Sequence, residues 1–194
     1  MVDDGSVELV RLTDDPAGCR ELVDHLRHQG QRLWVMGYIV GPDRAAGLSP
    51  GGYGDDGTVA LGLVAQMAAE LGAGALTLLE VDNRYAAAAL IRQLVELEYL
   101  SWWMTENPGE RCRWIRASVD ERRTLFSPAA LRKMAGGRFT SGPYHAHCGM
   151  GGHPDPRARL LLPDHKPAVE TDALVGDLLH HLGRVRRFVE EDGS

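Results

Sequence analysis

The stretch from 82 to 106, DNRYAAAALIRQLVELEYLSWWMTE, constrains the fold more than any other part of the chain. Residues at three- and four-residue steps share one face of a helix. One such face carries a mixture of aromatic, small and charged side chains: Tyr85, Ala89, Arg92, Glu96, Tyr99 and Trp103. Apolar side chains cover much of the remaining surface: Leu90, Ile91, Leu94, Val95 and Leu97. A helix that is apolar on more than one side is buried on more than one side, so this segment is predicted to be the central helix of a bundle.

Several other segments show helical patterns with a capping residue or a proline at the start. They predict further helices at 15–31, 58–80, 110–126, 127–137 and 170–191. Thr58 is the predicted cap of the second of these helices, and Gly72 and Gly74 predict a break or kink within it. The run RLWVMGYIV at 32–40 fits either an extension of the first helix or a short strand, because periodicity does not separate the two.

Two segments rich in glycine and proline predict loops. Residues 41–57 contain six glycines and two prolines, which is too many for a regular element, and they predict a long mobile linker. Residues 141–156, SGPYHAHCGMGGHPDP, predict a histidine-rich loop. The whole pattern predicts one all-α domain over residues 1–194, a single-domain bundle of roughly five to seven helices with its core at about 58–192.

Composition narrows the classes of function. The chain has 194 residues, of which 44% are hydrophobic and 25% charged, as expected for one soluble globular domain. A net charge of −6 argues against non-specific attraction to nucleic acid phosphates. Three dispersed cysteines predict a reducing compartment. Because no secretory pattern opens the chain and charges interrupt the apolar region at 59–104, we expect a cytoplasmic protein with no membrane span.

Arg92 and Glu96 are charged residues on a helix that is otherwise mostly apolar. Their spacing of four residues allows a direct ion pair. A buried charge has to be paired, so loss of one partner from a buried pair is expected to cost roughly 3–5 kcal/mol. The pair either orients the bundle from its interior or forms the floor of a functional site that residues 138–153 complete.

The histidine-rich loop contains three of the eight histidines and one of the three cysteines. We expect it to lie against the central helix, with His145 or His147 near Glu96 and with Tyr99, Ser141 and Tyr144 in the same polar cluster. The histidines at 180 and 181 are predicted to lie on a helix surface. As an alternative, the loop's side chains have the donor types and the close spacing to surround a zinc ion: His145, His147, Cys148 and His153.

A resemblance to a known family rests on three short motifs. These are R-x-L-x-E-x-x-Y-L at 92–100, a following ER…W helix, and a later S…H segment. In these motifs, over about residues 60–165, the chain resembles a bacterial all-helical family of unknown function that is associated with the HEPN superfamily.

The resemblance implies metal-independent RNA cleavage. HEPN ribonucleases carry an arginine followed by a histidine after four to six residues, and six residues separate Arg138 from His145. His145 would act as the base, with His147 as a further candidate, and Arg138 would stabilise the charge on the phosphate. HEPN enzymes assemble this site across a symmetric dimer, so a homodimer is implied. Two features depart from the family: a usually polar position holds Phe139, and Gly142 with Pro143 interrupts the helix that carries the motif.

Two classes of function follow. The acidic charge, Phe139 and the Gly142–Pro143 break favour a non-catalytic interaction module with a protein partner, in a toxin or phage-defence context. The spacing of Arg138 and His145 and the polar cluster favour a ribonuclease that binds RNA. Neither class requires a cofactor, and only the zinc alternative includes a metal.

Overall fold

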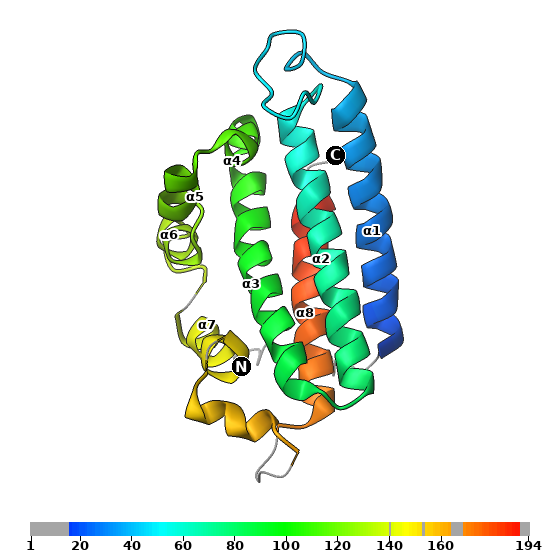
Figure 1. Ribbon diagram of the computed structural model, residues 1–194, viewed down its shortest axis with the longest axis vertical. Coiled ribbons are helices and arrows are strands. Elements are labelled where there is room, and N and C mark those ends of the chain that lie inside the picture. The colour runs from blue at the N-terminus through cyan, green and yellow to red at the C-terminus, as the bar shows by residue number, and fades with distance from the viewer. Residues whose placement is uncertain (1–15, 140, 153, 164–168, 191–194) are drawn as a thin grey trace, which may run out of the picture.

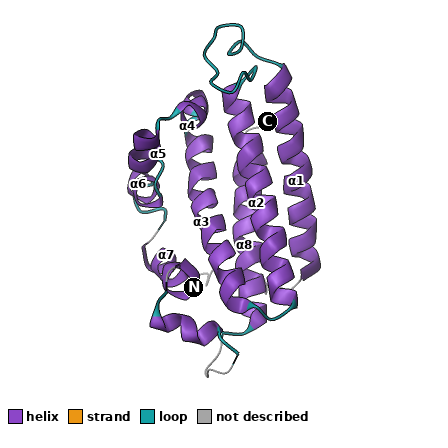
Figure 2. Cartoon of the chain, in the orientation of Figure 1, coloured by secondary structure: helices purple, strands orange, loops and turns teal. Residues whose placement is uncertain are grey.

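The chain folds as an all-α protein in a computed structural model, which describes residues 16–139, 141–152, 154–163 and 169–190. Four long helices lie side by side as a bundle (Figure 1): α1 (Pro16–Ile39), α2 (Asp56–Glu80), α3 (Arg84–Glu106) and α8 (Thr171–Glu190). No strand occurs within the described ranges (Figure 2). The predicted fold class is therefore confirmed.

α2 packs most extensively against α1. α2 and α8 each contact the other three long helices, whereas α1 and α3 pack mainly against α2 and α8. Glycine permits the closest approach, because a Cβ on Gly62 would lie 2.6 Å from the backbone nitrogen of Trp34. A Cβ on Gly30 would lie 2.8 Å from the carbonyl oxygen of Gly62. The small residues of α2 therefore bring α1 and α2 closest together.

α3 is covered on the side away from the bundle by short helices that follow it in the chain. These are α4 (Cys112–Arg116), α5 (Val119–Leu125), α6 (Pro128–Met134) and α7 (Ser141–His147), with helical turns at Pro108–Glu110, Cys148–Gly152 and Pro156–Leu161. They form a second layer, which we call the short-helix layer (Figure 1). Because α6, α7 and the Cys148–Gly152 turn contact α3, this helix is buried on more than one side, as its apolar surface predicts.

The core has an aliphatic and an aromatic part. Aliphatic side chains from the four long helices fill the first part, among them Leu26, Ile91, Leu94, Leu178 and Leu182. Aromatic side chains fill the second part, between α3, α8 and the short-helix layer: Tyr99, Trp102, Trp103, Phe139 and Phe188. The Phe139 ring centroid lies 4.4 Å from that of Tyr99 and 5.5 Å from that of Trp102. These contacts hold the segment after α6 against α3.

The first two helices differ in detail from their predicted bounds. α1 continues to Ile39, so the run at 32–40 extends the helix and forms no strand. The cap of α2 is Asp55, whose carboxylate accepts hydrogen bonds from the backbone N–H groups of Gly57 and Thr58. Thr58, the predicted cap, donates its hydroxyl hydrogen to the same carboxylate. α2 then continues unbroken to Glu80, past both glycines that predicted a break.

The segments after α3 are more divided than predicted. The predicted helix at 110–126 is split into α4 and α5. Ser118 caps the start of α5 in a capping box with Glu121, so the helix that ends with α4 does not continue. Part of the predicted loop at 141–156 is helical, as α7 and the turn that follows it. The described residues therefore contain eight α-helices, more than the predicted five to seven.

The glycine-rich segment between α1 and α2 is a loop, as predicted, but it is tied to the bundle. Asp56, the first residue of α2, is fully buried and accepts hydrogen bonds from Ser49 of this loop and from Nε of Arg116. Nη2 of Arg116 lies 2.6 Å from Oδ2 of Asp43, also in the loop. One guanidinium therefore links α4 to both the loop and the start of α2.

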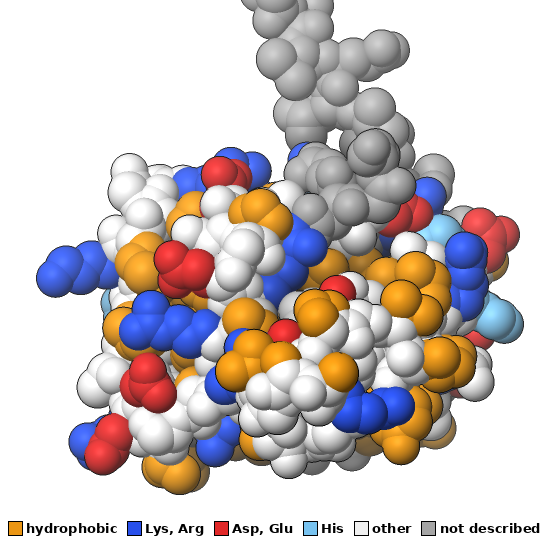
Figure 3. All heavy atoms as spheres, turned by 90° about the horizontal axis from the view of Figure 1, so that it is seen from above, with side chains coloured by type: hydrophobic (Ala, Val, Ile, Leu, Met, Phe, Trp, Pro, Cys, Tyr) orange, Lys and Arg blue, Asp and Glu red, His pale blue; other side chains and the backbone are white. Residues whose placement is uncertain are grey.

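Large hydrophobic side chains are exposed at the end of α1 and in the adjoining loop: Val35, Met36, Tyr38, Ile39, Val40 and Leu48. We call them the α1-end patch. Figure 3, which views the molecule from above relative to Figure 1, shows surface hydrophobic side chains interspersed with charged ones. Exposed apolar patches of this kind are typical of protein–protein contacts.

Among the described residues, α2 is the one helix that is long and apolar enough to cross a membrane by length and composition. Its most apolar window is 61% buried inside the bundle. This burial is what the core helix of a soluble protein shows.

Replacement of Arg116 by leucine is expected to lower the free energy of unfolding by about 2–4 kcal/mol. The substitution leaves the buried carboxylate of Asp56 without its cation, and an unpaired buried charge is costly. Urea denaturation measures the change. Arg113→Leu is the matched control on the same short helix, because the side chain of Arg113 is about half exposed and its ion pairs with Glu110 and Glu121 lie at the surface. Equal effects of the two substitutions would contradict the assigned role of Arg116.

Candidate metal centre

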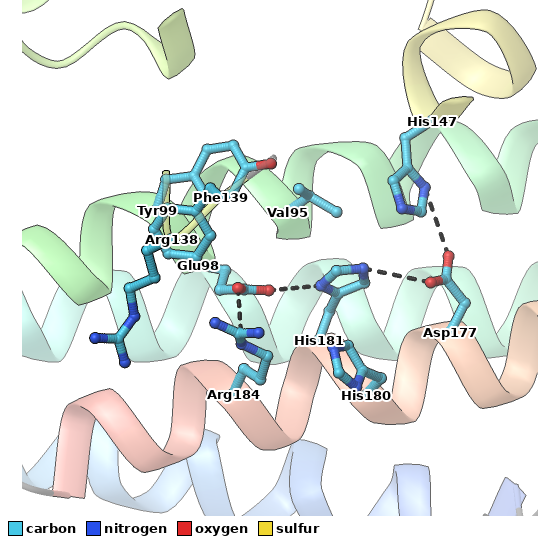
Figure 4. A pocket seen from close by; sticks show the side chains of 10 residues that line it. All are labelled: Val95, Glu98, Tyr99, Arg138, Phe139, His147, Asp177, His180, His181 and Arg184. Atoms are coloured by element: carbon cyan, nitrogen blue, oxygen red, sulfur yellow. Dashed lines mark hydrogen bonds and ion pairs between the residues drawn. The ribbon is translucent and has the colours of Figure 1, made fainter. Parts of the chain in front are cut away.

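A pocket of about 260 Å³ lies between α3, α8 and the short-helix layer. Figure 4 shows the side chains that line it. Six of them carry the argument that follows: Glu98 from α3, Arg138 and His147 from the short-helix layer, and Asp177, His181 and Arg184 from α8.

α8 places three of these side chains on one face. Asp177, His181 and Arg184 follow one another at steps of four and three residues, so they lie in a row along the helix. The row faces α3, and Glu98 reaches it from the opposite side (Figure 4). The pocket wall is thus built from two long helices whose contributing residues are far apart in sequence.

Glu98 is a buried carboxylate with a cation on each oxygen. Only 3% of its side chain is exposed. Nδ1 of His181 lies 2.6 Å from Oε2 of Glu98, and Nε of Arg184 lies 2.8 Å from Oε1. A buried carboxylate of this kind is tolerated only when such partners offset its lost hydration.

His181 is hydrogen-bonded on both ring nitrogens. Nδ1 faces Glu98, and Nε2 lies 3.3 Å from Oδ1 of Asp177. Burial lowers the pKa of His181, but the hydrogen bonds to Asp177 and Glu98 outweigh this effect and raise the pKa to about 9. At neutral pH, without a bound ion, the ring is a cation between two carboxylates.

His147 completes the arrangement from the short-helix layer. Nδ1 of His147 lies 3.5 Å from Oδ2 of Asp177, and its ring centroid lies 5.3 Å from that of His181. Burial lowers the pKa of His147 more than the nearby Asp177 raises it, so the ring is neutral at pH 7. Burial raises the pKa of Asp177, but His181 and His147 lower it by a larger amount. The pKa is therefore below its ordinary value, and the carboxylate is ionised at neutral pH.

His147, Asp177 and His181 have the spacing of ligands to one metal ion. One donor atom from each lies within 4.8 Å of the other two. Two ligands about 2.0–2.1 Å from a tetrahedral ion are roughly 3.4 Å apart. His147 Nδ1 lies 3.5 Å from Oδ2 of Asp177, and His181 Nε2 lies 3.3 Å from the other carboxylate oxygen, Oδ1. Glu98 accepts the Nδ1 hydrogen of His181 and leaves Nε2 for the ion, which is the usual outer carboxylate contact of a metal-bound histidine.

The predicted pair of Arg92 and Glu96 forms, but it is only half-buried. Nη1 of Arg92 lies 2.6 Å from Oε1 of Glu96, with 20% and 28% of the two side chains exposed. Of the two alternatives for this pair, a fully interior location is not observed, because α7 covers the pair through Tyr144 without enclosing it. The smaller desolvation makes loss of Arg92 less costly than the roughly 3–5 kcal/mol of a fully buried pair.

The histidine-rich segment lies against α3, as expected, but through Tyr144. The Tyr144 hydroxyl donates a hydrogen bond of 3.2 Å to Glu96. Burial, Cys148 and Glu96 together raise the pKa of Tyr144 to about 12. The carboxylate that faces His147 is Asp177 of α8 and not Glu96.

The other predicted residues are distributed around the pocket. Arg138 lines it, with Nη1 3.7 Å from Glu106, whereas the pocket lining within the described residues does not include His145, which is exposed on α7. Tyr99 lies in the pocket wall and packs on Phe139. Phe139, where the HEPN-associated family usually has a polar residue, therefore packs in the aromatic part of the core.

The predicted zinc ligands are only partly brought together. His147 belongs to the metal-like cluster, but among the described residues no such cluster includes His145 or Cys148. His153 and the side chain of Ser141 lie outside the described part of the chain. His181, predicted to be a surface residue, is buried because Glu98 neutralises it. The spacing of Asp177, His181 and Arg184 on one helical face was the available sequence signal.

Comparison of the chain with models of protein families, with characterised proteins and with solved structures finds no match. The resemblance to the HEPN-associated family therefore remains based on its short motifs. What the pocket does has to follow from its own chemistry.

The stability of the ion-free protein is expected to fall as the pH rises through about 9. An unfolded histidine has a pKa of about 6.5, so the folded protein binds the His181 proton more tightly than the unfolded chain does. The resulting stabilisation is complete below pH 6.5 and is lost above the folded pKa. We expect the free energy of unfolding to fall by about 3 kcal/mol over this range in urea titrations with a chelator present.

The His181→Gln variant provides the comparison for this pH dependence. It is expected to be less stable at neutral pH, because Glu98 loses a cation, and to show a flatter pH profile. The same slope in both proteins would assign the proton to another group.

Proposed function

We propose that this protein binds one divalent transition-metal ion of the zinc class and presents it to the pocket between α3, α8 and the short-helix layer. The observation that carries the proposal is the convergence of His147 and His181, from two different parts of the fold, on the carboxylate of Asp177. The buried Glu98 supports it by fixing the orientation of His181.

The ligand types indicate the class of ion. Two imidazole nitrogens and one carboxylate oxygen suit zinc and its neighbours, whereas calcium and magnesium prefer oxygen ligands throughout. Three protein ligands leave at least one coordination position for water or a bound molecule, which is typical of sites that act on a ligand. Structural zinc sites usually fill all four positions with protein groups.

The ion would also join two parts of the molecule. His147 belongs to the short-helix layer, and Asp177 and His181 belong to α8 of the bundle. A shared ion would hold the layer against the bundle and stabilise the folded state by mass action.

A protein-interaction module is the second candidate function, and the exposed α1-end patch supports it. A bound ion that fixes the short-helix layer is compatible with this function. The cytoplasmic location, the homodimer, and RNA cleavage by Arg138 and His145 remain predictions from the sequence.

The metal proposal is tested with Co²⁺, whose visible absorption reports its coordination. The wild-type protein is expected to bind about one Co²⁺ ion per chain. The absorption spectrum should be that of an ion with a low coordination number. His147→Ala, Asp177→Asn and His181→Gln should each weaken binding at least tenfold, since each removes one of three ligands. The matched control is His145→Ala, an exposed histidine on the same short helix as His147. Loss of binding in this control, or no binding by the wild type, would contradict the assigned ligands.

Ion binding at pH 7 should release about one proton per chain. The proton comes from His181, whose raised pKa keeps it protonated in the ion-free protein, while His147 and Asp177 already have the forms that bind metal. Calorimetric titrations in buffers of different ionisation enthalpy measure the number of protons released. Affinity should therefore weaken as the pH falls from 9 towards 7, and an affinity independent of pH would place the ion elsewhere.

The interaction module is tested by self-association, because a homodimer is the predicted partner. If the α1-end patch forms the dimer contact, the wild type should sediment as a dimer and Ile39→Glu as a monomer. Leu162→Glu is the control, since Leu162 is also exposed but lies outside the patch. A monomeric wild type at high concentration would exclude a stable homodimer.

A further inference from the structure

A second pocket, which we call the α2–α3 groove, lies between α2, α3 and the corner that joins α5 to α6. It has a volume of about 590 Å³, and no described residue lines both this groove and the pocket of the candidate metal centre. Volumes of roughly 300–1,000 Å³ are typical of sites for small molecules. Most of the side chains that line the groove are apolar, among them Leu63, Met67, Leu97, Leu100 and Phe126.

The groove has an apolar end and a polar end. α2 and α3 are joined by a short turn and run antiparallel (Figure 1), so residues equally far from that turn lie opposite each other. Leu100 is far from the turn, and Phe126, which packs on Trp103 one helical turn further along α3, belongs to the same end. Two polar side chains of the lining, Glu70 and Gln93, lie at the end nearer the turn.

Glu96 is the lining carboxylate that the fold holds most firmly. Its side chain is only 28% exposed, and its Oε1 accepts hydrogen bonds from Nη1 of Arg92 at 2.6 Å and from the Tyr144 hydroxyl at 3.2 Å. Both partners use this one oxygen, and among the described residues no hydrogen bond is made to Oε2. Because an ionised carboxylate only accepts hydrogen bonds, a ligand group that contacts Oε2 has to be a donor.

The charges of the lining favour a positive ligand. Two carboxylates, Glu70 and Glu96, line the groove, whereas no described lysine, arginine or histidine does so. The pair of Glu70 with Arg27 has a closest distance of 3.3 Å and is exposed on both sides, so it contributes little. An ammonium group at the polar end therefore has complementary charge, and an anion there is repelled.

We propose that the α2–α3 groove binds a small amphipathic amine, with its apolar body against Leu100 and Phe126 and its ammonium group on Oε2 of Glu96. Along α2 the groove extends over residues 63–71, which is about 12 Å at 1.5 Å per residue. This length and the volume of about 590 Å³ fit one small molecule, whereas a stable protein partner covers a much larger surface. The inference is independent of the metal centre, because the two pockets share no described lining residue.

The test uses the full-length protein and dansylcadaverine, in which an alkyl ammonium group is attached to an apolar fluorescent ring system. Its fluorescence should rise on binding, because the dansyl group emits more strongly in apolar surroundings, and one molecule should bind per chain. Dansyl pentylamide has the same rings and chain without the ammonium group. It should bind at least tenfold more weakly, since it lacks the charged hydrogen bond to Glu96. The apolar anion 1-anilinonaphthalene-8-sulfonate should also bind more weakly than dansylcadaverine.

Glu96→Gln tests the position of the ammonium group. This variant should bind dansylcadaverine at least tenfold more weakly than the wild type and bind the neutral pentylamide equally well. The neutral probe is the internal control, because damage to the groove would weaken both probes. Glu106→Gln is the matched control on the same helix, since Glu106 is 53% exposed and does not line the groove. It should bind both probes as the wild type does.

Met67→Trp tests the groove itself. Met67 lines the groove and is 37% exposed, so a larger ring there should fill the groove without disturbing the core. Both dansyl probes should then bind at least tenfold more weakly. Met134→Trp is the matched control, because Met134 is exposed on α6 and does not line the groove. Co²⁺ binding should be the same in both variants as in the wild type.

Three results would overturn the proposal. The first is no binding of dansylcadaverine by the wild type. The second is equal affinity for the ammonium, neutral and anionic probes, which would make the groove a non-selective apolar surface. The third is unchanged binding of dansylcadaverine by Glu96→Gln or Met67→Trp, which would place the probe elsewhere on the molecule. None of these results bears on the metal centre, which Co²⁺ binding tests separately.

Discussion

The ion triplet of His181, Glu98 and Arg184 is the interaction on which the rest of the pocket depends. Glu98 is buried between helices, and each of its oxygens faces a cation from α8. Because loss of either cation would strand a buried charge, the triplet fixes the register between α3 and α8. That register in turn places Asp177, one helical turn before His181, opposite the end of α7. The pairing of the buried Glu98 therefore also sets the geometry of the candidate metal centre.

The short-helix layer supplies the other half of the centre, and its position has separate causes. Phe139 packs among the aromatic rings of α3, and Tyr144 hydrogen-bonds to Glu96. Both contacts precede His147 in the chain, and the Cys148–Gly152 turn that follows it also packs on α3, so His147 is held over α8 from both sides. The resulting centre has rigid supports on both sides, which is a general requirement for a site that must keep ligand atoms within a fraction of an ångström.

Much of the fold could be read from periodicity and capping, and much of the site could not. α3 and α6 follow from an apolar pattern and from the Ser127–Pro128 start, which are local signals. The signal that divides residues 110–126 into two helices is also local, since Ser118 and Glu121 have the spacing of a capping box. The burial of His181 was different in kind, because its partner Glu98 lies 83 residues away in sequence. The pair of Arg92 and Glu96 is visible in the sequence because its residues have helical spacing, whereas the pair of Glu98 and His181, which joins two helices, is not.

The close fit of α1 and α2 at Gly30 and Gly62 has a consequence for the order in which the molecule assembles. These helices are consecutive, so their contact closes a short stretch of chain at a small entropic cost. The candidate metal ligands, by contrast, lie on α7 and α8, and the carboxylate that orients His181 lies on α3. During synthesis from the N-terminus, the α1–α2 hairpin can form while α8 is still absent. The pocket is thus completed by α8, and a nascent chain has no complete candidate metal centre until that helix has docked.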